Sequence, residues 1–310
     1  MTKRLQNKVS ESKLTLPVVT AYGIAVWLAA GGVQNGWWLQ LVAGLAATLL
    51  MAELNNANAL IRIYSRMVSS SLVVLLCCAC FLLPSPGSML LTALLTAAYL
   101  MLFRTYQDKA AAGWTYYAFL TVGLTTLLFP GLALFVPLLW LLMAWQLQSL
   151  SWRTWTASVL ALATPYWLWL CYATLTADFE PLAAHFTPPA DMLATGTARL
   201  FPLGRPLPMT VIFLTILSLT GTIHFMRKKS ADKIFIRQLF GFFIIMDLCA
   251  LALLIAMPQH SNFLLPVVIV NASPLTGHFI ALTQTKVTNA AFIAIALTAL
   301  GLTVYNLLTI

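Results

Sequence analysis

Asp247 is the residue whose position is most unusual for its chemistry. It lies about twelve residues into the apolar segment Phe235–Met257, which is roughly 18 Å along a helix at 1.5 Å per residue. A carboxylate at that depth costs several kcal/mol unless it is paired, neutral or hydrated. Its neighbours three and four positions away are apolar, so any partner must come from another helix. Asp247 therefore predicts either a proton or ion site or a protonated side chain with one interhelical hydrogen bond.

The following apolar segment, Phe263–Leu282, has polar residues that belong to the same candidate pathway. Asn271 and Ser273 reach a depth similar to that of Asp247, and His278 follows near the end of the segment. The segment also contains three residues that favour a broken helix: Pro266, Pro274 and Gly277. Irregular backbone inside a membrane survives only where it faces protein or a water-filled cavity. A broken helix beside an intramembrane carboxyl is therefore an expected ion or substrate site, although proline kinks also serve structure alone.

A second group of chemically capable residues lies in the one long connection, Ala177–Leu207. His185, Arg199 and Arg205 occur there together with three acids. Arginine binds phosphate bidentately, and histidine can act as a general base, so these three residues are the candidates for catalysis on a lipid pyrophosphate. A solvated loop near lipid headgroups is the alternative. The stretch Ala190–Phe201, bounded by prolines, predicts a short interfacial helix.

The composition says what must position these residues. Of the 310 residues, 61% are hydrophobic and only 8% are charged, and the mean hydropathy is +0.89. Soluble domains carry roughly a quarter charged residues, so the solvent for most of this surface must be lipid. The apolar segments show no alternation of the kind that barrel strands require. The sequence therefore predicts an all-α, polytopic transmembrane helix bundle that forms one domain over residues 1–310.

About eleven apolar segments are long enough to be considered as spans, near the length of about 20 residues that a bilayer requires. They are Leu14–Ala30, Trp37–Leu54, Met67–Leu83, Met89–Phe103, Trp114–Phe129, Gly131–Leu147, Thr154–Leu175, Pro208–Met226, Phe235–Met257, Phe263–Leu282 and Thr288–Leu308. The first is expected to be an uncleaved span. The pair joined at Pro130 is short enough to be a hairpin that does not cross fully.

The basic residues predict the orientation of these spans. With the N-terminus in the cytoplasm and the C-terminus outside, 15 of the 17 lysines and arginines fall on the cytoplasmic side. The two exceptions are Arg199 and Arg205. Such a bias is what the positive-inside rule describes, so the net charge of +9 reflects membrane orientation. No basic stripe interleaved with aromatic residues is present, which excludes nucleic acid as a partner.

Several common chemistries are excluded by the motifs that the sequence lacks. It has no phosphate-binding loop, dinucleotide fingerprint, zinc-protease motif or nucleophilic serine elbow, so we expect no cofactor. The five cysteines lie within apolar segments and have no metal or redox spacing, so we expect no metal site. Whether the protein is an enzyme stays open at this point.

Short motifs distributed over most of the chain resemble those of a known family. They are Glu53-Leu54-Asn55 with Leu60-Ile61, Gly123 with Leu128-Phe129-Pro130, Ser151-Trp152-Arg153 with Pro165, and Leu265-Pro266 with Asn271-Ala272-Ser273-Pro274. This pattern resembles the uncharacterised multi-pass inner-membrane proteins of Bacteroidota, domain of unknown function 6427. The resemblance implies a bacterial inner membrane, with the periplasm outside. It implies no catalytic residues, because none is established for that family.

Three functions follow as hypotheses. The first is envelope biogenesis with polyprenyl-linked glycan at the periplasmic face, which would use His185, Arg199 and Arg205. The second is proton-coupled transport of a small solute, which would use Asp247 and the segment Asn271–Pro274. The third is a non-catalytic subunit that binds other inner-membrane proteins. In each case membrane lipid is a partner.

Overall fold

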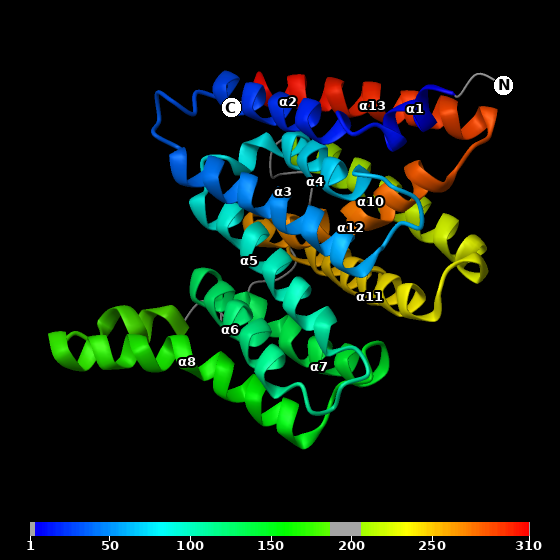
Figure 1. Cartoon of the computed structure of the whole chain (residues 1–310). Coiled ribbons are helices and arrows are strands. Elements are labelled where there is room, and N and C mark those ends of the chain that lie inside the picture. The colour runs from blue at the N-terminus through cyan, green and yellow to red at the C-terminus, as the bar shows by residue number, and fades with distance from the viewer. Residues whose placement is uncertain (1–3, 187–205, 310) are drawn as a thin grey trace. The chain divides into compact units, whose positions relative to one another are not determined.

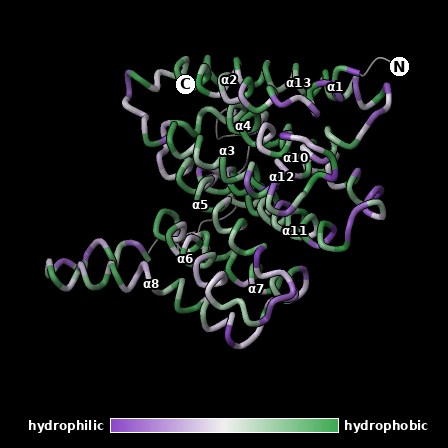
Figure 2. Tube along the Cα trace, viewed as in Figure 1, coloured by the Kyte–Doolittle hydropathy of each residue, from purple (hydrophilic) through white to green (hydrophobic). Residues whose placement is uncertain are grey.

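A computed structural model describes residues 4–186 and 206–309, and they are helical with no strand among them. Seven of the helices are long and apolar enough to cross a membrane, or eight if the bent pair α1 (Leu5–Glu11) and α2 (Thr15–Ala29) forms one span. The chain therefore has the helices of a membrane protein. Figure 2 shows that hydrophobic residues cover these helices while hydrophilic residues gather at turns, such as the turn between α10 and α11.

The chain divides into two compact units. Unit 1 comprises Met1–Ala93 and Arg199–Ile310, and unit 2 comprises Leu94–Ala198. Unit 1 holds α1, α2, α3 (Trp38–Asn58), α4 (Met67–Cys78), the start of α5 (Pro86–Leu102), α10 (Pro206–Lys228), α11 (Ile234–Ala256), α12 (Ser261–Leu282) and α13 (Lys286–Leu307). Unit 2 holds the end of α5, α6 (Ala112–Leu128), α7 (Phe135–Trp145) and α8 (Trp152–Thr176). The expected single domain stays a prediction.

Helix α12 is the centre of unit 1. It packs against α4, α10 and α11 (Figure 1), and the whole of its most apolar stretch is buried inside the protein. Two glycines allow the close approach. A Cβ on Gly277 would lie 2.9 Å from the backbone of Val68 on α4, and one on Gly221 of α10 would lie 2.9 Å from the Leu275 backbone. Small residues at such crossings let membrane helices approach until their backbones touch.

Substitution of Gly221 by alanine is expected to destabilise unit 1. The added methyl group would meet backbone rather than a flexible side chain, and overpacking of this kind costs about 1–3 kcal/mol. The measurement is the melting temperature of the purified protein in detergent. Gly301→Ala on α13 is the matched control, because a Cβ there has no atom within 4 Å. Equal melting temperatures for the two variants would contradict the close α10–α12 packing.

The prediction of a broken helix at α12 is wrong. Residues Ser261–Leu282 form one continuous α-helix with Pro266 and Pro274 inside it. A proline removes the hydrogen bond to the carbonyl four residues earlier, which for Pro266 is the carbonyl of Asn262. That oxygen instead accepts a hydrogen bond of 2.6 Å from the Ser88 hydroxyl. A side chain from another helix thus replaces the missing backbone donor, and the helix continues.

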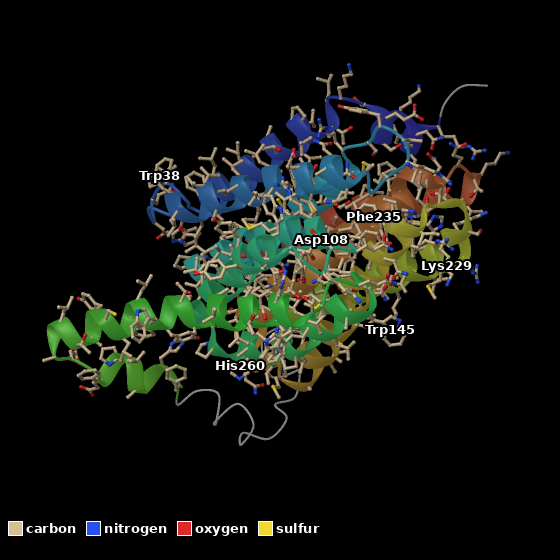
Figure 3. All side chains as sticks on the ribbon, turned by 60° about the horizontal axis from the view of Figure 1, so that its bottom comes forward. Trp38, Asp108, Trp145, Lys229, Phe235 and His260 are labelled. Atoms are coloured by element: carbon tan, nitrogen blue, oxygen red, sulfur yellow. The ribbon has the colours of Figure 1, made fainter. Side chains whose placement is uncertain are left out.

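The basic loops of unit 1 meet at one end, which we call the basic end. Arg4 donates to the carbonyl of Gln284, and Arg62 in the α3–α4 connection donates to the carbonyl of Ala231 in the α10–α11 connection. Figure 1 places the α3–α4, α10–α11 and α12–α13 connections on the same side of unit 1 as the N-terminus, and the C-terminus on the opposite side. In Figure 3, Lys229 labels the connection before α11 and His260 the connection after it.

Helix α4 is short, but its continuation runs the length of α12. Val68 at its start lies against Gly277 near the basic end. The chain then passes through the 3-10 turn Cys80–Leu82 to Ser88, which binds Asn262 at the other end of α12.

All eleven segments expected from the sequence coincide with helices. Seven or eight of these helices are long and apolar enough to cross a membrane, and crossing by the shorter ones stays a prediction.

Unit 2 is organised around the pairing of α6 with α8. Gly123 faces Pro165, and a Cβ on this glycine would lie 3.0 Å from the proline ring. The Tyr166 hydroxyl donates to the Thr126 hydroxyl over 3.0 Å. Helix α8 begins with a capping box in which Ser151 and Thr154 satisfy each other's backbone N–H groups. Such reciprocal capping explains why α8 begins where it does.

Candidate functional site

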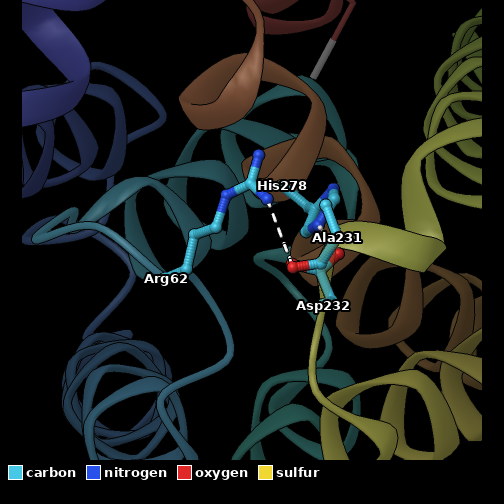
Figure 4. Close-up of polar contacts among 4 residues, drawn as sticks. All are labelled: Arg62, Ala231, Asp232 and His278. Atoms are coloured by element: carbon cyan, nitrogen blue, oxygen red, sulfur yellow. Dashed lines mark hydrogen bonds and ion pairs between the residues drawn. The ribbon is translucent and has the colours of Figure 1, made fainter.

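A buried polar cluster lies at the basic end of unit 1 (Figure 4). Asp232, which follows the 3-10 turn Lys229–Ala231 after α10, places one carboxylate oxygen 3.3 Å from Nε2 of His278 on α12. Its other oxygen lies 3.9 Å from an Arg62 guanidinium nitrogen. The side chains of Asp232 and His278 are almost fully buried, whereas that of Arg62 is 47% exposed. We call these three residues, together with His224, the inner cluster.

Aromatic rings surround the histidine of this cluster. The His278 ring packs edge-on against Phe240, with ring centres 4.8 Å apart, and against Phe225 at 5.3 Å. The ring of His224 on α10 lies 5.6 Å away. Nδ1 of His278 and Nε2 of His224 have no hydrogen-bond partner among the described residues. Each histidine therefore keeps a free nitrogen that can accept or release a proton.

Asp247 lies deeper, halfway along α11, and is completely buried. The Ser218 side chain on α10 interacts with its carboxyl. Yet both Asp247 oxygens and the Ser218 hydroxyl oxygen lack a partner in hydrogen-bond geometry among the described residues. Ser218 of α10 is therefore close enough to interact with Asp247, but the interhelical hydrogen bond expected from the sequence is not formed within the described part of the chain. Burial of a carboxyl without hydrogen bonds favours its neutral, protonated form.

The two polar residues expected beside Asp247 make hydrogen bonds within their own helix. The Asn271 amide donates to the Val267 carbonyl over 2.8 Å, and the Ser273 hydroxyl donates to the Ile269 carbonyl. Both side chains are fully buried in α12. His278 from the same predicted pathway belongs instead to the inner cluster at the basic end. The structure therefore divides the predicted pathway into a deep part and an end part.

The candidate site in the long connection is described only in part. Arg199 and Arg205, together with the predicted interfacial helix Ala190–Phe201, lie outside the described residues. His185 is described within the helical residues 180–186, and its ring lies 5.0 Å from that of Trp169. Partial burial lowers the pKa of His185 below its ordinary value, so the ring is neutral at pH 7. The envelope-glycan hypothesis, which required all three side chains, stays a prediction.

Sequence reasoning missed three members of the inner cluster. Arg62, His224 and Asp232 were not singled out in the sequence as candidates for a polar site. The available signal was the type of residue: Asp232 is the one acid in a connection rich in lysine and arginine. A single acid in such a basic connection indicates a specific ion pair. Within the described residues, no group of three or more potential ligands is placed to hold a metal ion.

Comparison with known protein families, curated proteins and solved structures found no match for this chain.

Proposed function

We propose that this protein is a multi-pass protein of a bacterial inner membrane that couples proton movement to the transport of a small solute. The observation that carries the proposal is the fully buried carboxyl of Asp247, which has no hydrogen-bond partner among the described residues. An ionisable residue inside a membrane is costly, and such residues mark proton and ion pathways. The neutral acid can lose its proton when water or a solute enters beside it.

Helix α10 carries polar groups at positions between Ser218, beside Asp247, and the inner cluster. Thr222 follows Ser218 by one helical turn, about 6 Å at 1.5 Å per residue, and its hydroxyl oxygen also lacks a partner among the described residues. His224 comes two residues later and faces His278. A proton leaving Asp247 therefore meets hydroxyl groups first and imidazoles next. It reaches the basic end at Asp232, which has contact with both His278 and Arg62.

The proposed orientation places the basic end in the cytoplasm. The gathering of the basic loops of unit 1 at one end supports the positive-inside arrangement. In this proposal the N-terminus is cytoplasmic, the C-terminus is periplasmic, and the shorter segments cross as well to give eleven spans. The resemblance of short motifs to those of the uncharacterised inner-membrane family of Bacteroidota is consistent with this location.

The test is transport by the purified protein in lipid vesicles that contain a pH-sensitive dye. Small anionic, cationic and neutral solutes are added one at a time outside the vesicles. At least one solute should change the internal pH faster than in vesicles without protein, and its radiolabelled form should accumulate only when a proton gradient is present. If no solute in any of the three charge classes moves protons, the proposal fails.

A further inference from the structure

An apolar cavity in unit 1 is separate from the proposed proton pathway. Its volume is about 290 Å³, and its walls come from α1, α2, α4, α10, α12 and α13. Almost all of the lining is apolar, so water gains few hydrogen bonds there and the space favours a hydrocarbon guest. The outer walls, α2 and α13, carry many exposed apolar side chains, including Val18 and Leu300. Hydrocarbon chains of the bilayer therefore lie against the same helices that enclose the cavity.

Two hydroxyl groups in the cavity wall indicate that the guest has a polar atom. Ser70 on α4 and Thr276 on α12 both line the cavity and are at most 3% exposed. Neither hydroxyl has a hydrogen-bond partner among the described residues. Neighbouring hydroxyls behave differently: Ser69 and Thr283 donate to carbonyls of their own helices. Two unsatisfied donors on one wall suit a ligand that supplies an acceptor oxygen, since leaving each unmade costs about 1–3 kcal/mol.

The depth of these hydroxyls fits an ester carbonyl. Ser70 is three residues from the start of α4, and Thr276 is six residues from the end of α12. Both helix ends belong to the basic end, so the hydroxyls lie roughly 5–9 Å inside it at 1.5 Å per residue. The ester groups of a glycerolipid occupy the same narrow zone, between the headgroups and the hydrocarbon core.

Two lysines lie near the end of the cavity that is lined by the bend between α1 and α2. Val9 and Thr15, which line it, flank the bend of 92° between α1 and α2. The exposed side chains of Lys8 and Lys13 stand beside them in the sequence. Helix α1 is fixed at this place because the Gln6 amide donates to the Ile280 carbonyl over 2.7 Å and to the Thr283 hydroxyl over 2.6 Å. Fixed lysines at a membrane surface attract anionic headgroups.

We propose that this cavity binds one acyl chain of an anionic glycerophospholipid. An ester oxygen accepts hydrogen bonds from Ser70 and Thr276, and the headgroup lies near Lys8 and Lys13. The site is independent of proton transport, since it shares no residue with the inner cluster or with Asp247. It takes its ligand from the bilayer that surrounds the protein.

The test is retention of lipid through purification. The protein is incorporated into bilayers of equal parts phosphatidylglycerol and phosphatidylcholine, extracted in mild detergent and weighed by native mass spectrometry. The wild type should retain about one phosphatidylglycerol. Ala296→Trp, which fills the cavity from α13, should lose it. Leu297→Trp is the control, because this neighbouring side chain is 65% exposed and lies outside the cavity. Equal retention by the two variants would show boundary lipid only and overturn the proposal.

Two further variants keep the proposal testable if Ala296→Trp does not fold. Ser70→Ala combined with Thr276→Val removes both donors with little change of volume and should weaken retention roughly tenfold, as expected for one to two net hydrogen bonds. Lys8→Glu combined with Lys13→Glu should abolish the preference for phosphatidylglycerol over phosphatidylcholine. Unchanged retention in the first pair, or an unchanged preference in the second, would overturn the corresponding contact.

Discussion

Replacement of Asp247 by asparagine is expected to abolish proton-coupled transport and to leave the fold intact. The amide has nearly the shape of the protonated acid, and it can use the same Ser218 hydroxyl. It cannot release a proton, however, so every step that requires one stops. The dye-loaded vesicles described above measure the effect, and we expect the solute-driven change of internal pH to fall at least tenfold, to the level of protein-free vesicles.

The control for this variant is Asp178→Asn. Asp178 is an exposed acid that accepts a hydrogen bond of 3.2 Å from the Glu180 backbone, so the same chemical change is made outside the pathway. This variant should transport like the wild type. The melting temperature of the Asp247 variant must equal that of the wild type, which separates loss of transport from loss of folding. Normal transport by a folded Asp247→Asn protein would remove Asp247 from the mechanism.

Replacement of Asp232 by alanine is expected to have the largest effect on stability among substitutions in the inner cluster. It leaves the buried Nε2 of His278 without its hydrogen-bond partner, and an unsatisfied buried group costs about 1–3 kcal/mol, more when it is charged. The melting temperature in detergent should fall by roughly 5 °C. Arg62→Ala should change it much less, since the Arg62 side chain is half exposed and 3.9 Å away, and exposed ion pairs contribute about 0–1 kcal/mol.

A double substitution separates the pair from its surroundings. Combining Asp232→Ala with His278→Phe removes both polar partners and adds a ring to the aromatic contacts of Phe225 and Phe240. Replacing both members of a buried polar pair by apolar groups is often nearly neutral. The double variant should therefore be more stable than the sum of the two single effects predicts. Strictly additive losses would mean that the two side chains do not depend on each other.

The parts of the fold that depend on local pattern could be predicted from the sequence. Each expected apolar segment coincides with a helix, because in hydrocarbon a helix alone satisfies its backbone within one segment. Asp247 stood out for the same reason: its cost is visible from its neighbours along the chain. The error at α12 also has a local origin, because the two prolines were visible whereas Ser88, which replaces one missing donor, is far away in the sequence.

The inner cluster could not be predicted, because its members are distant in sequence. Arg62 and Asp232 are 170 residues apart in a mostly apolar chain, and only the packing of the helices brings them together. His278 and Asp232 each carry a local signal, but nothing along the chain indicates that the two side chains meet. Their meeting depends on the close packing of α12 against α4 and α10, which Gly277 and Gly221 allow.

The complete enclosure of α12 has a consequence for how the protein is made. The ribosome synthesises α4, α10 and α11 before α12. Until α12 is inserted, the surfaces of these three helices that will contact it face lipid. Helix α12 carries two prolines and several polar side chains, which lower its own preference for hydrocarbon. Its stability in the membrane therefore comes from the earlier helices that receive it. Unit 1 thus gains its central helix late in synthesis, when α12 displaces lipid from the facing surfaces of α4, α10 and α11.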